Sequence, residues 1–478
     1  MNKYKKLAMN TMIFAIGSFG SKILVFLLTY LYTSNISPAD SSTKELLEIT
    51  ANFLIPVFTF SMNEAIIRFG LDRNYSKRQV FTSACCMTGL GLVLMLIISP
   101  LLGLITFLDY LDGYTILLLV YICTSSFRSL CSQFVRARGM VKLFSFDGIL
   151  TTLTLFIFNI VFIAGLDMGV KGFLLSVILS DFLSAVFLFF VAKLYEFLNI
   201  RYFSPKLAKS MLKFSVPLIP TAVMWIITGF SDRLFIRYME SSSDKIVLGE
   251  AAAGIYGYAT KIPNLISMVS TIFFQAWNMS AITENNSADR SRFYEKVYGA
   301  YQSIMFIAAA FLVAGVQIIT PFVVNPDVFP EYAEVYIYTP LLVAAVLFMC
   351  FNQFLSSIYT ATKHTKNSFW TSLIACTANI ILNIILIPKL GIQGASIATL
   401  ASYFICYCIR IVDARRYVPF RVNNGKFILN TLVLLGLCAV VIAQPLYYPA
   451  YLVCGFLFVV VCNYQAIIVM LKKLLKRG

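Results

Sequence analysis

The chain is built from long apolar segments separated by short polar ones. A helix needs about 20 apolar residues to cross the hydrocarbon core of a bilayer, and fourteen segments approach or exceed this length. The pattern therefore predicts an all-α integral membrane protein with about 14 transmembrane helices. The predicted spans are 7–33, 45–68, 79–108, 113–136, 144–166, 170–193, 214–239, 249–281, 294–320, 334–361, 367–388, 391–412, 427–444 and 448–471.

The lysines and arginines orient these spans. Positive charge collects in short loops on the cytoplasmic side of a membrane. With a cytoplasmic N-terminus, alternate loops carry nearly all of the basic residues. The other loops hold only four lysines, which are Lys44, Lys171, Lys245 and Lys389. This alternation predicts that both termini are cytoplasmic. It also explains the net charge of +16 without a nucleic-acid partner, because basic loops lie near anionic lipid.

Composition supports the membrane assignment. The chain is 59% hydrophobic and 13% charged, whereas soluble domains are about 45–50% apolar and about 25% charged. The eleven cysteines lie almost entirely in apolar segments without a C-x-x-C spacing, and the single histidine, His364, lies in a basic loop. A metal centre or a disulfide framework is therefore not supported. We expect no cofactor.

Two parts of the chain resemble each other. Aligning the segment that begins at Ala137 with the one that begins at Ala361 places Lys142 opposite Lys366 and Asn159 opposite Asn383. A weaker similarity places "FGSKIL", which contains Lys22, opposite "FSDRLF", which contains Arg233. Repeats with an even number of helices have the same orientation in the membrane, an arrangement found in transporters that bind substrate near mid-membrane.

The repeat predicts the domain organisation. We expect an N-terminal lobe at 1–200 with helices 1–6, and a C-terminal lobe at 201–425 with helices 7–12. Two additional helices at 426–478 fall outside the repeat.

Several charged residues fall inside the predicted spans. Placing a charged side chain at the bilayer centre costs about 2.5–3.5 kcal/mol on insertion scales, so these residues should face a water-filled cavity or each other. Lys22 and Lys261 have no acid nearby in sequence and are candidates for binding an anionic substrate. Arg237 is interpreted as an anchor that extends to the outer headgroups.

The acidic candidates for orientation or ion coupling are Asp232, Asp181 and Glu64. Successive helical residues point about 100° apart, so Asp232 and Arg233 cannot share one direction. One would line the cavity while the other pairs with a neighbouring helix; a purely structural tie is an equally weighted alternative. A structural role is favoured for Asp181, as a hydrogen-bonded core acid, and for Glu64.

Four prolines interrupt predicted spans: Pro56, Pro217, Pro220 and Pro263. Proline removes a backbone hydrogen bond and bends a helix. These positions are predicted bending points for alternating access, with a static kink as the alternative.

Short motifs carry a family resemblance. They are "PLIP" at 217–220, "SDR" at 231–233, "GIYGYATKIP" at 254–263, "FFQAW" at 273–277, "NEAIIRFGLD" at 63–72 and "RARG" at 136–139. With these motifs the chain resembles the bacterial polysaccharide and O-antigen flippases of the MOP (multidrug/oligosaccharidyl-lipid/polysaccharide) exporter superfamily. That superfamily also contains lipid II flippases and MATE drug exporters.

The resemblance implies two six-helix lobes that form a V around a cationic cavity in a bacterial cytoplasmic membrane. It implies that undecaprenyl-pyrophosphate-linked oligosaccharide, a repeat unit of capsule, O-antigen or other polysaccharide, is moved from the cytoplasmic to the periplasmic leaflet. Lys22, Arg233 and Lys261 would hold the pyrophosphate, and Asp232 would orient Arg233 or respond to ions. The expected partners are this substrate, membrane lipids and polysaccharide polymerase machinery. The energy source is left open between H⁺, Na⁺ and the membrane potential.

Two alternatives stay open. A MATE-type drug exporter would need acidic cavity residues for cationic drugs, and cations outnumber acids within the predicted spans. A membrane enzyme of polysaccharide biosynthesis, such as a polymerase or an acyltransferase, would need acid–base groups, and the single loop histidine is a poor basis for them. We therefore expect a transporter and not an enzyme.

Overall fold

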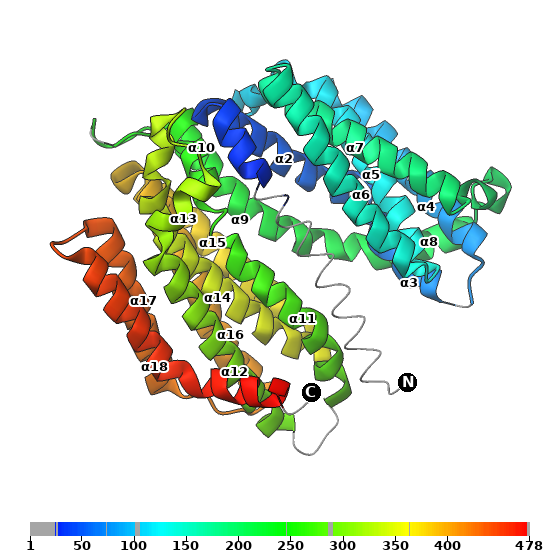
Figure 1. The fold of residues 1–478 in the computed structure, drawn as a ribbon. Coiled ribbons are helices and arrows are strands. Elements are labelled where there is room, and N and C mark those ends of the chain that lie inside the picture. Colours follow the sequence, from blue (N-terminus) through cyan, green and yellow to red (C-terminus); the bar gives the residue numbers. More distant parts are fainter. Residues whose placement is uncertain are drawn as a thin grey trace. The chain divides into compact units, whose positions relative to one another are not determined.

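The computed structural model describes residues 24, 27–72, 74–100, 106–244, 246–284, 290–362 and 364–475. The described residues form helices and connecting turns, and none of them is in a strand. The chain divides into two compact units, Met1–Phe230 (unit 1) and Ser231–Gly478 (unit 2), and the boundary falls inside one helix, α9 (Ile219–Tyr238). Figure 1 shows unit 1 from blue to green and unit 2 from green to red.

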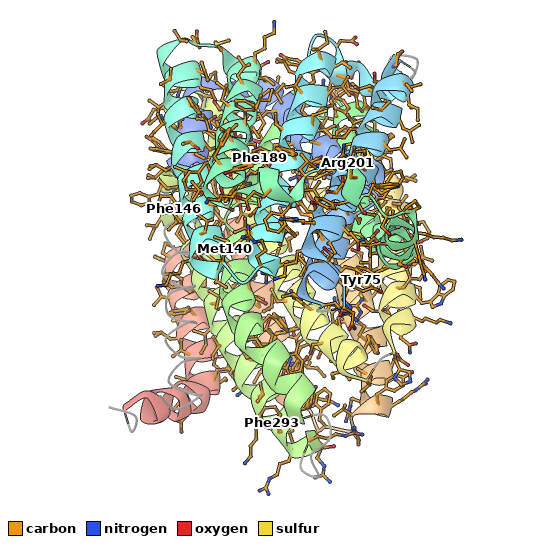
Figure 2. All side chains as sticks on the ribbon, turned by 90° about the vertical axis from the view of Figure 1, so that its right-hand side faces the viewer. Tyr75, Met140, Phe146, Phe189, Arg201 and Phe293 are labelled. Carbon is orange, nitrogen blue, oxygen red and sulfur yellow. The ribbon has the colours of Figure 1, made fainter. Side chains whose placement is uncertain are left out.

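Unit 1 is a bundle of membrane-length helices followed by short helices at one end. Its elements are α2 (Pro38–Phe58), α3 (Met62–Leu71), α4 (Lys77–Ile98), η2 (Thr106–Leu111), α5 (Thr115–Ala137), α6 (Val141–Asn159), η3 (Ile160–Gly165), α7 (Gly169–Val191), η4 (Leu194–Phe197), η5 (Ile200–Tyr202), α8 (Pro205–Ser215) and η6 (Val216–Leu218). Helix α7 packs on α5 and α6, and α3 packs on α4, α5 and α8. Figure 2 labels Tyr75 and Met140, which precede α4 and α6, and Arg201 of η5.

The second predicted span is broken. Helix α2 contains Pro56 and ends at Phe58, and α3 follows at an angle of 52°. Between them, Phe60 and Ser61 adopt the left-handed backbone region, with φ of 53° and 49°. Gly91 of α4 packs against this break, where a Cβ atom would lie 2.8 Å from the carbonyl carbon of Phe58. The close approach of two backbones therefore requires glycine at this position.

Unit 2 contains the rest of α9 and nine further helices. They are α10 (Glu250–Ala259), α11 (Asn264–Glu284), α12 (Arg290–Ala314), α13 (Val316–Val323), α14 (Val335–Ala361), α15 (Thr365–Leu390), α16 (Ile392–Tyr417), α17 (Asn424–Ala443) and α18 (Tyr448–Leu475), with the short η7 (Pro330–Glu334) before α14. Helices α14, α15 and α16 form its centre, and α11 packs on α14. Helices α17 and α18 pair with each other and with α12 (Figure 1).

The protein is a multi-pass membrane protein, as predicted. Within the described residues, nine helices are long and apolar enough to cross a membrane, or ten if the bent α2–α3 pair is one span. Most of the first predicted span, 7–33, lies outside the described residues. The predicted span 249–281 is broken at Thr260–Pro263 into α10 and α11, and the span 294–320 is broken at Gly315 into α12 and α13.

The predicted start of the second span was wrong, and this error misplaced the charged residue Lys44. The predicted outer loop before residue 45 is the start of α2, which has Ser37 as its N-cap and Pro38 in its first turn. Lys44 is therefore in a helix, only 2% exposed, where its ammonium lies 4.4 Å and 4.5 Å from the rings of Tyr32 and Phe173. The polar sequence of this first turn resembled a loop and concealed the start of the helix.

Candidate functional site

Asp232 is the centre of a buried polar cluster in unit 2. Its carboxylate accepts hydrogen bonds from Tyr256 Oη at 2.7 Å, Asn383 Nδ2 at 2.6 Å and Thr399 Oγ1 at 2.8 Å. These partners lie on α10, α15 and α16, so one carboxylate on α9 joins four helices. Among the described residues, no lysine or arginine forms an ion pair with Asp232. Neutral dipoles therefore stabilise this carboxylate.

Amide groups extend the Asp232 cluster. Asn379 Oδ1 accepts from Asn383 Nδ2 at 3.2 Å and from Ser231 Oγ at 3.3 Å, and Asn379 Nδ2 contacts Thr399 Oγ1 at 3.4 Å. Asp232 is 2% exposed, and Asn379 and Asn383 are fully buried. The Oδ1 atom of Asn383 is buried without a hydrogen-bond partner among the described residues. An unsatisfied acceptor beside a buried carboxylate is energetically costly and is a position where a cation would be stabilised.

Arg233 and Lys261 lie at one helix end. The Arg233 guanidinium contacts Thr260 Oγ1 at 3.5 Å and lies 5.7 Å from the ring of Tyr256. Lys261 follows Thr260, the C-cap of α10, and its ammonium lies 6.0 Å from the ring of Tyr258. A helix C-terminus carries partial negative charge that favours nearby cations. The fold thus brings two of the three predicted substrate-binding cations to the C-terminus of α10.

Asp232 and Arg233 point in different directions. Asp232 faces α10, α15 and α16, whereas Arg233 is only half-buried. This separation follows from the 100° step between successive helical residues.

Arg237 does not extend to the headgroups. Its side chain is 4% exposed and forms a 2.7 Å ion pair with Glu250, the first residue of α10. The interpretation as an outer anchor was wrong because an acidic partner lies within reach in the next helix.

Unit 1 has a second charged cluster, which contains Asp181. Arg128 on α5 lies 3.5 Å from Asp147 on α6 and 3.5 Å from Asp181 on α7. Ser125 donates to Asp181, and Ser184 donates to Asp147. Two carboxylates therefore share one arginine at the junction of three helices, with Asp181 as a hydrogen-bonded, ion-paired group.

A buried arginine occupies the corresponding region of unit 2. The alignment that places Asn159 opposite Asn383 also places Asp147 opposite Thr371. Thr371 Oγ1 accepts a 2.8 Å hydrogen bond from Arg410 Nε, and Arg410 also donates to Ser372 Oγ and to the carbonyl of Asn352. Arg410 is 1% exposed. Arg410 lies within the predicted span 391–412, and α16 continues past it to Tyr417.

The remaining predicted site residues do not lie in either cluster. Lys22 lies outside the described residues. Glu64 is exposed in the first turn of α3. Pro56 lies two residues before the end of α2, Pro217 is in η6, and Pro220 is in the first turn of α9.

Pro263 lies in the break between α10 and α11. Movement at any of these four prolines stays a prediction.

Sequence reasoning missed the partners of Asp232. Asn379 and Asn383 lie four residues apart on one helix face, an arrangement of amides that is unusual in an otherwise apolar segment. Asn383 also occupied a matched position in the repeat. That signal could have identified α15 as the helix that Asp232 contacts. Tyr256 lies in the motif at 254–263 but was not singled out within it. Thr399 had no comparable signal, because isolated hydroxyl groups are common in membrane helices.

Comparison with known proteins agrees with this architecture. No family model matches the chain. An uncharacterized membrane protein of Methanocaldococcus jannaschii is 25% identical over 290 residues, which are 59% of this chain and 55% of the relative. A Haloferax volcanii protein named "Probable flippase AglR" is 25% identical over 70% of this chain and 68% of its own length. The chain spans little more than half the length of the first of these curated relatives.

The solved structures decide the fold. The structure of the lipid II flippase MurJ in an inward closed conformation matches with a TM-score of 0.70 at 17% identity, over 97% of this chain and 100% of that one. An inward-facing MATE family transporter of the MOP superfamily matches with a TM-score of 0.61 at 15% identity, over 84% and 98% of the two chains. The chain has the MOP-superfamily fold. These similarities confirm the predicted all-α membrane fold, and the first of them covers nearly the whole chain.

Proposed function

We propose that this MOP-fold protein is a flippase that moves a polyprenyl-pyrophosphate-linked oligosaccharide between leaflets of the cytoplasmic membrane, with both termini cytoplasmic. The observation that carries the proposal is the placement of Arg233 and Lys261 at the C-terminus of α10. Two cations held in a membrane-spanning bundle suit a pyrophosphate, which must exchange its water for fixed positive charge. The similarity to a protein named as a flippase supports the same class of activity.

The substrate proposal is tested by lipid binding. The full chain in nanodiscs is titrated with undecaprenyl pyrophosphate bearing an oligosaccharide, and Arg233→Gln and Lys261→Gln are compared with Lys389→Gln. Lys389 is an exposed lysine in the last turn of α15. We expect each site variant to weaken binding about tenfold and Lys389→Gln to have no effect. Equal affinities for all four proteins would contradict the assignment of these cations.

We further propose that Asp232 is the site of the coupling ion. The carboxylate of Asp232 and the unsatisfied Oδ1 of Asn383, which lies beside it, are two oxygen ligands that a small hard cation could use. The unsatisfied Asn383 Oδ1 supports Na⁺ over H⁺. Replacing choline in the buffer with Na⁺ at constant ionic strength should raise the melting temperature of the wild type. It should not raise the melting temperature of Asp232→Asn. A stability that responds to pH and not to Na⁺ would assign the site to H⁺.

A cationic drug is the competing cargo. A MATE-type exporter of cations needs accessible acids. Among the described residues of unit 2, Asp232 is almost fully buried and already hydrogen-bonded to three donors. This arrangement leaves the carboxylate little surface for an organic cation, so the anionic cargo is the better match.

A further inference from the structure

A polar surface follows one side of α11. Lys261 precedes the helix, and Asn264 and Thr271 are exposed on it. Seven residues turn a helix by almost two full turns, so Asn264 and Thr271 share one face about 10 Å apart along the axis. Ser267, half-buried, lies between them on the same side.

A neighbouring helix adds an amide to this surface. Gln353 of α14 is exposed, and its Oε1 accepts from Ser270 Oγ of α11 at 3.5 Å. Ser270 lies on the side of α11 that adjoins Ser267, because three residues separate them. Gln353 therefore borders the same strip. We name Lys261, Asn264, Ser267, Thr271 and Gln353 the polar seam.

The opposite part of the exposed face is apolar. Val269 is 45% exposed and lies about 140° around the helix from Asn264. In a membrane helix, an exposed apolar strip suits lipid, whereas exposed amides and hydroxyls suit water or a polar ligand. The exposed face of α11 thus divides into a lipid-facing side and a polar side.

The chemistry of the polar seam specifies a ligand class. Beyond Lys261 the seam contains only amides and hydroxyls, without a carboxylate. Neutral groups that both donate and accept hydrogen bonds match sugar hydroxyls, and they provide no counter-charge for a cationic drug. The seam begins at Lys261, one of the two cations at the C-terminus of α10.

We propose that the polar seam binds the carbohydrate of the lipid-linked substrate, with the sugar next to the pyrophosphate at Asn264 and a later sugar at Thr271 and Gln353. This inference rests on the proposed flippase function. It predicts that the seam distinguishes lipids that carry sugars from lipids that do not, because the phosphate is held elsewhere, by Arg233 and Lys261.

The test compares two lipids in proteoliposomes of the full chain. The probes are undecaprenyl pyrophosphate with and without a neutral disaccharide. The nearly isosteric variant Asn264→Leu/Thr271→Val/Gln353→Met is compared with the wild type and with Val269→Thr, which places a hydroxyl on the apolar side. Thermal unfolding confirms that each protein is folded.

We expect the triple variant to slow leaflet exchange of the disaccharide lipid about tenfold or more, since three hydrogen-bonding groups are lost. Exchange of the sugar-free lipid should change less than about twofold, and Val269→Thr should match the wild type. Equal slowing of both lipids, or of neither, would overturn the seam assignment while leaving the flippase function intact. If the wild type moves neither lipid, the proposed function and the seam assignment both fall.

Discussion

Asn383 donates a 2.6 Å hydrogen bond to Asp232, and thereby joins α15 to α9 at the centre of unit 2. The neighbouring Arg233 is not the counter-ion of this carboxylate, since its guanidinium lies near Thr260 and Tyr256. Asp232 and Arg233 are adjacent in the sequence but therefore lie in two different environments. Asp232 contributes to the cohesion of four helices, while Arg233 remains half-buried near Lys261.

Replacing Asp232 by asparagine should destabilise the protein. Tyr256, Asn383 and Thr399 all donate to this side chain, and an amide would direct its own N–H groups at one or more of these donors. We expect a loss of about 1–3 kcal/mol in the free energy of unfolding, measured by thermal unfolding in detergent. Asp327→Asn, at an exposed position of unit 2, is the matched control. Equal stability of the two variants would show that the hydrogen bonds to Asp232 do not stabilise the fold.

Gly91→Ala should prevent correct packing of α4 on the break between α2 and α3. The added Cβ would collide with the Phe58 carbonyl group, which is backbone and cannot rotate away. Gly89 lies on the same helix with open space around its Cβ position, so Gly89→Ala should be neutral or stabilising by up to about 1 kcal/mol. The yield of monodisperse protein and its melting temperature distinguish the two. If Gly91→Ala were as stable as Gly89→Ala, the described break would be incorrect.

Arg410→Gln should weaken the centre of unit 2. The guanidinium joins α16 to α14 and α15 through Asn352, Thr371 and Ser372, and glutamine is too short to replace these contacts. We expect a loss of about 3 kcal/mol or more, because several hydrogen bonds to a charged group disappear. Arg416, whose side chain is 74% exposed, provides the control Arg416→Gln with a change below about 0.5 kcal/mol. Similar melting temperatures for Arg410→Gln and Arg416→Gln would contradict the buried, hydrogen-bonded position of Arg410.

Arg128 and Asp147 should be energetically coupled. Arg128→Gln alone leaves Asp147 and Asp181 buried with no cation between them, which is costly. Adding Asp147→Asn removes one of the uncompensated charges. A double-mutant cycle of unfolding free energies should therefore give a coupling of about 1 kcal/mol or more. Additive effects would mean that the 3.5 Å contacts contribute no net stability.

The helical type of the elements was predictable because a bilayer imposes it. An apolar segment of sufficient length has few alternatives to a membrane helix, and the predicted spans 79–108 and 170–193 correspond to α4 and α7. The breaks within the predicted spans were harder to predict from the sequence. The α2–α3 break depends on the approach of Gly91 from another helix, and no local sequence pattern reports such a contact.

Charged positions show the same limit. Lys44 was assigned to a loop because charges normally mark the ends of membrane spans, and Arg410 was not singled out near the end of its predicted span. Lys44 pairs with Glu48 one turn along α2, but it also packs against the ring of Phe173, which is far away in sequence. The buried Arg410 likewise depends on a distant partner, the carbonyl of Asn352. The sequence predicted Arg233 and Lys261 as substrate-binding cations, and only the fold could show that both lie at the C-terminal end of α10.

Leaflet exchange by the wild-type protein tests the central claim most directly. Liposomes containing the full chain are loaded with fluorescent undecaprenyl pyrophosphate oligosaccharide, and the fraction in each leaflet is followed with a membrane-impermeant quencher. Parallel liposomes receive a cationic dye. The flippase account predicts protein-dependent exchange of the lipid and no movement of the dye. Expulsion of the dye with no exchange of the lipid would contradict it and identify a drug exporter.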